Sequence, residues 1–242
     1  MNFPEKGYKT MNIQGFQKTT LLDYPGHVAA TVFFGGCNFC CPFCHNGDLV
    51  LSPNRPAAFS TEEVLSYLKK RQRILDGVCV TGGEPTLQKE LPDFLARIKE
   101  LDLTVKLDTN GYRPQALQEL CEHGLVDYVA MDIKGAPEKY AKICGMPGID
   151  ISRIRESVAF LLEGQVEYEF RTTVVRELHE EADFHAIGAL IRHAGAYYLQ
   201  GYQDSPQVIS PGFSAYTLEE LNRFRELLLH YICVVEIRGV EH

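Results

Sequence analysis

The alternation of strand and helix patterns is the feature that most constrains the fold of this 242-residue chain. Residues 28–34 are β-branched and aromatic, as expected of a buried strand. Leu91, Phe94, Leu95 and Ile98 instead share one helix face by their spacing. The two patterns alternate along the chain, and the ranges expected to be strands are 28–34, 78–81, 104–107, 128–133, 167–175, 197–199 and 232–237.

The segments between these strands predict helices that cover a parallel sheet. Capping boxes of Ser60 with Glu63 and of Thr217 with Glu220 mark two helix starts. About six strand–helix units and a closing strand are too few for an eightfold barrel and too many for a minimal doubly wound sheet. We therefore predict an α/β fold, a partial, laterally open (β/α)6 barrel with parallel strands.

The chain carries no linker, low-complexity segment or solenoid repeat, so we expect a single domain over residues 1–242. Met11 offers an alternative start, which would make residues 1–11 an N-terminal extension. Residues 201–215 contain glycine and proline breaks and are expected to form a loop.

Charge and hydropathy exclude several classes of function. The net charge of −8 lacks the basic footprint of nonspecific nucleic-acid binding. The start has no apolar signal region, and no stretch is long and apolar enough to span a membrane. We therefore expect a cytoplasmic protein, in which clustered cysteines more often bind metal than form disulfides.

Four of the eight cysteines, Cys37, Cys40, Cys41 and Cys44, directly follow the first expected strand. Two abutting C-x-x-C pairs are hard to close around zinc, whose pairs are usually separated by roughly 15–20 residues. A thioredoxin-like pair would leave the other cysteines unexplained. Cys37, Cys41 and Cys44 can instead hold three irons of a cubic cluster and leave the fourth iron open for chemistry.

This spacing, with aromatic Phe43 before the third cysteine, resembles the signature of the radical S-adenosylmethionine (SAM) superfamily. Thr81-Gly82-Gly83-Glu84-Pro85 follows the second expected strand and is similar to the glycine motif of that superfamily. The resemblance implies one [4Fe–4S] cluster on the three cysteines, with Gly82, Gly83 and Glu84 at the SAM amino group. The cluster would cleave SAM to methionine and a 5′-deoxyadenosyl radical.

Three further strand ends resemble motifs of glycyl-radical activating enzymes, namely Asp108-Thr109-Asn110-Gly111, Met131-Asp132-Ile133-Lys134 and Arg171-Thr172-Thr173-Val174. By resemblance, Lys134 and Arg171 would face the SAM carboxylate. The same resemblance assigns a monovalent cation or the SAM ribose to Asp108, Thr109 and Asp132. Asn110 is also a candidate, and Tyr202, after the sixth expected strand, is a candidate adenine contact.

Residues 15–26, taken with 36–39, 44–46 and 237–240, narrow the resemblance to the activating proteins of anaerobic ribonucleoside-triphosphate reductase, which are similar to pyruvate formate-lyase activating enzyme. This implies a radical SAM oxidoreductase that generates a glycyl radical on that reductase. Flavodoxin or ferredoxin would donate the electron, and no nucleic acid or membrane would be a partner.

Three alternatives remain at this level. A radical SAM enzyme acting on a small molecule, or the activase of another glycyl-radical enzyme such as pyruvate formate-lyase, would use the same cysteines. An iron–sulfur or zinc binding module would need a fourth ligand, for which Cys40 is the candidate. We expect Cys40 not to bind the cluster. The remaining cysteines are scattered along the chain, so we predict a single cluster.

Overall fold

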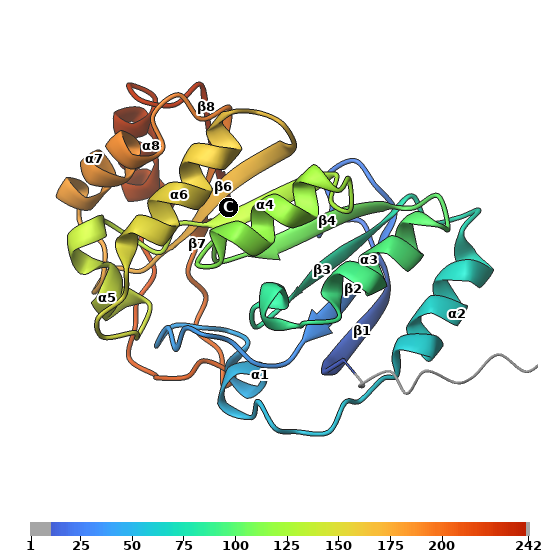
Figure 1. The fold of residues 1–242 in the computed structure, drawn as a ribbon. Coiled ribbons are helices and arrows are strands. Elements are labelled where there is room, and N and C mark those ends of the chain that lie inside the picture. Colours follow the sequence, from blue (N-terminus) through green and yellow to red (C-terminus); the bar gives the residue numbers. More distant parts are fainter. Residues whose placement is uncertain (1–10, 241–242) are drawn as a thin grey trace, which may run out of the picture.

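The computed structural model describes residues 11–240, which form one continuous sheet of eight strands flanked by helices (Figure 1). The strands are β1 (Ile13–Thr20), β2 (Ala29–Phe34), β3 (Gly77–Gly82), β4 (Thr104–Thr109), β5 (Tyr128–Asp132), β6 (Glu167–Val174), β7 (Ala196–Gly201) and β8 (Val234–Arg238). They lie in chain order, β1 antiparallel to β2 and all later neighbours parallel. Because β1 and β8 are the edges of this sheet, the barrel is open, which confirms the predicted fold class.

The helices are α1 (Gly47–Leu51), α2 (Thr61–Arg71), α3 (Leu91–Lys99), α4 (Pro114–Glu122), α5 (Tyr140–Ile143), α6 (Ile151–Leu162), α7 (Glu181–Leu190) and α8 (Leu218–Leu228), with 3-10 turns η1 (Pro85–Leu87) and η2 (Pro137–Lys139). Both predicted capping boxes are present, at the starts of α2 and α8. The predicted apolar face of α3 is buried. Burying such a stripe against the sheet stabilises the domain by about 2 kcal/mol for each large side chain.

Strand β1 was not predicted from the sequence. Its pairing with β2 shifts register between Ile13 and Gly15 and again between Gln17 and Thr20. These irregularities break the alternation of buried and exposed side chains by which a half-buried strand is recognised. The expected extension at residues 1–11 lies outside the described residues except for Met11, which is buried in the core.

The segment after β7 crosses to the cysteine loop. Apart from Gly201, which ends β7, residues 201–215 contain no helix or strand, as predicted. The backbone N–H of Ser210 donates to the carbonyl of Pro42 at 2.8 Å, and Figure 1 shows this segment, in orange, running beside α1. Among residues 11–240, no helix has the length and apolar character needed to cross a membrane.

Candidate active site

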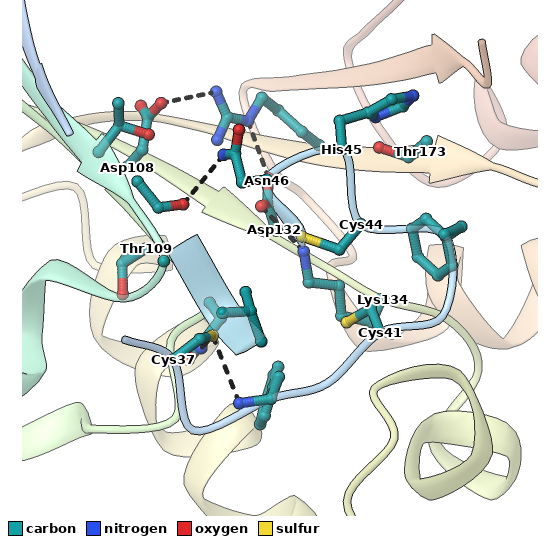
Figure 2. Close-up of a pocket in the computed structure, with 18 of the residues that line it drawn as sticks. Cys37, Cys41, Cys44, His45, Asn46, Asp108, Thr109, Asp132, Lys134 and Thr173 are labelled. Atoms are coloured by element: carbon teal, nitrogen blue, oxygen red, sulfur yellow. Dashed lines mark hydrogen bonds and ion pairs between the residues drawn. The ribbon is translucent and has the colours of Figure 1, made fainter. Parts of the chain in front are cut away.

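A cavity of about 250 Å³ opens at the carboxyl ends of the parallel strands (Figure 2). Most of the residues singled out from the sequence line it: Cys37, Cys41, Phe43, Cys44, Gly82, Gly83, Asp108, Thr109, Asn110, Asp132, Lys134 and Arg171. These side chains come from loops far apart in the chain. Parallel strands bring them together because all their carboxyl ends lie at one edge of the sheet.

The cysteine loop turns three of its four thiols toward this cavity. Cys37, Cys41 and Cys44 line the cavity wall, whereas Cys40 is exposed and does not. A turn closed by the Cys44 N–H on the Cys41 carbonyl, at 3.0 Å, sets the spacing of the last two ligands. The backbone of Cys40 is tied elsewhere, to the carbonyl of Cys144 at 2.9 Å.

The three thiols are largely buried, and both negatively and positively charged side chains lie near them. Burial raises the pKa of Cys37 to about 12, and the nearby Glu84 carboxylate acts in the same direction. Burial also raises the pKa of Cys41 to about 12 against the opposing charge of Lys134. The pKa of Cys44 is raised by burial as well. Each thiol therefore keeps its proton at neutral pH until a metal displaces it.

Three cysteine thiols on one cavity wall match the number of protein ligands that a cluster with one open iron needs. Within residues 11–240, no three His, Cys, Asp or Glu side chains converge on a point as ligands of a single ion would. Two N–H donors approach the sulfur of Cys37, from the backbone of Phe39 at 3.3 Å and from Asn110 at 3.8 Å. Such bonds favour a thiolate and tune a cluster. Next to Cys37 in the chain, the buried Nδ2 of Asn38 has no hydrogen-bond partner among the described residues.

Gly82 and Gly83 are required by the close approach of two backbones. Gly82 has φ +120°, and a Cβ there would lie 2.4 Å from the backbone of Phe34. A Cβ on Gly83 would lie 2.0 Å from the carbonyl oxygen of Gly36. The glycine motif is thereby pressed against the start of the cysteine loop, and Asn46 fastens it by donating to the Gly82 carbonyl at 3.1 Å.

Glu84 lies behind the cavity wall and is fully buried. Its Oε1 accepts from the backbone and hydroxyl of Thr86 and from the hydroxyl of Thr109 at 2.8 Å, and its Oε2 accepts from the Asn110 N–H at 2.7 Å. Burial raises its pKa against these bonds. The side chain therefore joins the glycine motif to the loop after β4 and does not reach the cavity.

Opposite the cysteines, fixed charges are arranged in pairs. Asp132 accepts from the Nε of Arg171 at 2.9 Å and from the Nζ of Lys134 at 3.0 Å, and Arg171 also lies 3.4 Å from Asp108 (Figure 2). Burial alone would raise the pKa of Asp132, but Arg171 and Lys134 outweigh it and lower the pKa to about 2. Burial disfavours the charged form of Lys134, yet Asp132 raises the pKa of Lys134 above its usual range.

Tyr202 lies beside the cavity and does not line it. Its hydroxyl donates to Asp204 at 3.0 Å, and its ring centroid is 5.6 Å from that of His45. Seven lining residues were not among the predicted site residues: Phe39, His45, Asn46, Val50, Thr81, Thr173 and Gln200. Phe39, His45 and Asn46 lie in the cysteine segment, and Thr81 and Thr173 belong to quoted motifs, so these residues had a signal in the sequence. Val50 and Gln200 had none.

Comparison with known proteins agrees with this geometry. The model of the Radical SAM superfamily matches residues 31–185. A protein of Methanocaldococcus jannaschii assigned as a glycyl-radical enzyme activating enzyme is 32% identical over 219 residues, 89% of each chain. The pyruvate formate-lyase 1-activating enzyme of Escherichia coli strain K12 is 27% identical over 193 residues, 76% of each chain.

A solved structure supports the fold alone. Streptococcus suis SuiB bound to S-adenosylmethionine superposes with a TM-score of 0.66 at 14% identity, covering 85% of this chain and 48% of that one. The family match and the near full-length relative show that the chain belongs to the radical SAM superfamily, as an enzyme related to the glycyl-radical enzyme activating enzymes.

Proposed function

We propose that this radical SAM enzyme generates a glycyl radical on anaerobic ribonucleoside-triphosphate reductase. Membership of the superfamily implies a [4Fe–4S] cluster and SAM as cofactors. The observation that carries the proposal is that three thiols, the glycine motif and two cationic side chains line one cavity. The choice of partner rests on residues 15–26, 36–39, 44–46 and 237–240, which resemble activating proteins of that reductase.

In this proposal Cys37, Cys41 and Cys44 hold the cluster, and Lys134 and Arg171 hold the SAM carboxylate. Gly82 and Gly83 line the cavity, and their backbone would receive the SAM amino group. The cluster, when bound, supplies the electron that breaks the S–C5′ bond of SAM and gives methionine and a 5′-deoxyadenosyl radical. Phe39 and Phe43, both buried and both lining the cavity, limit the access of water.

The radical would then take a hydrogen atom from a glycine α-carbon of the partner. Two further cavities, of about 280 and 330 Å³, lie next to each other at the carboxyl ends of β7 and β8, where both are lined by Gly201, Gln203 and Gly239. The first shares His45, Thr173 and Gln200 with the site cavity. We propose this open side of the barrel as the entrance for the partner's glycine loop, with flavodoxin or ferredoxin as the electron donor in the cytoplasm.

The second candidate partner is pyruvate formate-lyase, which the relative from Escherichia coli favours. A monovalent cation beside Asp108, Thr109 and Asp132 is not part of the proposal, because both carboxylates are already paired with cationic side chains.

The test uses anaerobically reconstituted protein, reduced with dithionite and given SAM, with Cys41→Ala as the control. We expect 5′-deoxyadenosine and methionine from the wild type and neither from the control. Each candidate partner is then added, and electron paramagnetic resonance is used to detect a glycyl radical. SAM cleavage without a radical on the reductase would overturn the choice of partner, and no cleavage by cluster-loaded protein would overturn the activity itself.

A further inference from the structure

A lysine lies inside the sheet beneath the site. Lys106, on β4, is only 2% exposed, although lysine is rarely buried completely. Its Nζ donates to the Oδ1 of Asp108, two residues further on the same face of the strand, and lies 4.0 Å from the sulfur of Cys79. Because an unpaired buried ammonium is very costly, the bond to Asp108 is what makes this position tolerable.

Every carboxylate oxygen of this ion-paired group contacts a cation. Asp108 has Lys106 on Oδ1 and Arg171 on Oδ2, and Asp132 has Arg171 on Oδ1 and Lys134 on Oδ2. Three cationic side chains thus share two carboxylates, which leaves one net positive charge at the cavity wall. The nearby buried Glu169 does not cancel it, since its carboxylate is paired with Arg238 at 3.2 Å.

These oxygens do not fit a mobile cation. A monovalent cation at Asp108, Thr109 and Asp132 would need oxygen ligands that are free to coordinate it. Both carboxylates are paired with fixed cations, and the hydroxyl of Thr109 donates to Glu84 at 2.8 Å while accepting from the Gly111 N–H at 3.1 Å.

We propose that the ammonium of Lys106 is a built-in substitute for a monovalent cation. It neutralises Asp108 from the side away from Arg171, so that this carboxylate does not consume the charge of Arg171, which can act on the SAM carboxylate together with Lys134. SAM therefore binds and is cleaved without added Na⁺ or K⁺. This inference rests on SAM binding as set out in the proposed function, and it is independent of which protein receives the radical.

The first test needs no variant. The SAM dissociation constant of cluster-loaded wild type is measured by calorimetry in tetramethylammonium chloride, whose cation is too large for the site, and in KCl and NaCl at equal ionic strength. Partner-free formation of 5′-deoxyadenosine is followed in the same salts. We expect both quantities to agree within about twofold across the salts. Weakening of SAM binding by about tenfold or more in tetramethylammonium chloride would overturn the proposal.

The second test removes the ammonium in two ways. Lys106→Ala leaves a void beside Asp108, whereas Lys106→Met fills it without charge. In tetramethylammonium chloride we expect SAM to bind each variant about tenfold more weakly than wild type. KCl or NH₄Cl should restore Lys106→Ala, because a small cation can enter the void, and should leave Lys106→Met impaired.

The third test measures the stability of protein that contains neither cluster nor SAM. The melting temperature of cluster-free Lys106→Ala should rise when K⁺ replaces tetramethylammonium, and that of the wild type should not. Lys99→Ala is the matched control, since Lys99 forms a salt bridge with Asp127 away from the site and should gain no cation dependence. Wild-type SAM affinity in Lys106→Met would show that the ammonium has no such role. If Lys106→Ala does not fold, SAM binding by Lys106→Met and by the wild type in the three salts still tests the proposal.

Discussion

The two parts of the sheet contribute differently to the site. Residues 29–174, which span β2 to β6, supply every described residue that lines the site cavity except Gln200. The two adjoining cavities are lined mainly by residues from the second part, 196–240, which spans β7 to β8. The first part carries the short motifs and the fixed charges, and the second carries a long loop. We therefore propose that the chemistry is carried out by the first part and that the second part selects the partner.

The largest expected effect lies in the cysteine loop. Cys41→Ala should abolish SAM cleavage, because a cluster with only two protein ligands is not retained. Cys40→Ala should leave both iron content and cleavage near wild-type values, because this residue is exposed and does not line the cavity. Iron and sulfide analysis with product chromatography checks both variants. Loss of the cluster in Cys40→Ala would favour the binding-module alternative.

Asp132 provides a test of the ion-paired side chains that line the cavity in residues 29–174. Its pKa is about 2 in the folded protein against an ordinary value of 3.8, so the ionised carboxylate, after the cost of its burial, adds on the order of 2 kcal/mol to the free energy of unfolding. This contribution is complete above the ordinary pKa and is lost as the pH falls toward about 2. Asp132→Asn should therefore be less stable near neutral pH and should converge with wild type in acid.

Urea unfolding of the cluster-free proteins between about pH 6 and pH 3 measures this difference. A stability difference that stays constant over the whole range would show that the ion pairs of Asp132 do not stabilise the fold. The same variant should bind SAM more weakly, since it releases Arg171 and Lys134 from their positions.

Glu84 tests whether the glycine motif acts through contact or through position. A Gln here replaces one accepting oxygen with a donor, so at least the Asn110 N–H at 2.7 Å or the Thr109 hydroxyl at 2.8 Å loses its partner. An unsatisfied buried group costs about 1–3 kcal/mol. Asn110, which donates to Cys37, should shift with it.

Glu84→Gln should therefore still load the cluster but show an altered resonance spectrum and about tenfold slower SAM cleavage. Gln88→Ala is a control on the same loop, since its side chain bonds the Gly35 carbonyl and contacts none of the cysteines. A variant with weaker SAM binding and an unchanged spectrum would instead support direct contact with SAM, as the sequence resemblance implied.

The sequence was informative where one short segment carries the whole signal. The cysteine spacing, the glycine motif and the strand ends at Asp108 and Asp132 are all local, and each lines the cavity in the structure. The burial of Glu84 was not predictable, because its partners Thr109 and Asn110 lie on the next strand–loop unit. Lys106 gave no signal of its role either, since only its strand register places it beside Cys79.

The last and smallest expected effect tests whether residues 196–240 act in partner recognition and not in SAM cleavage. Gln203 is exposed and lines both adjoining cavities, and its side chain donates to the Gly239 carbonyl at 3.1 Å. Gln203→Ala should slow glycyl-radical formation on the partner severalfold while leaving partner-free SAM cleavage unchanged. Gln207→Ala, an equally exposed residue of the same loop that lines neither cavity, is the matched control. Equal losses in both variants would point to general disturbance of the loop. A loss of partner-free cleavage in Gln203→Ala would mean that this loop belongs to the chemical site, and the division between the two parts would fail.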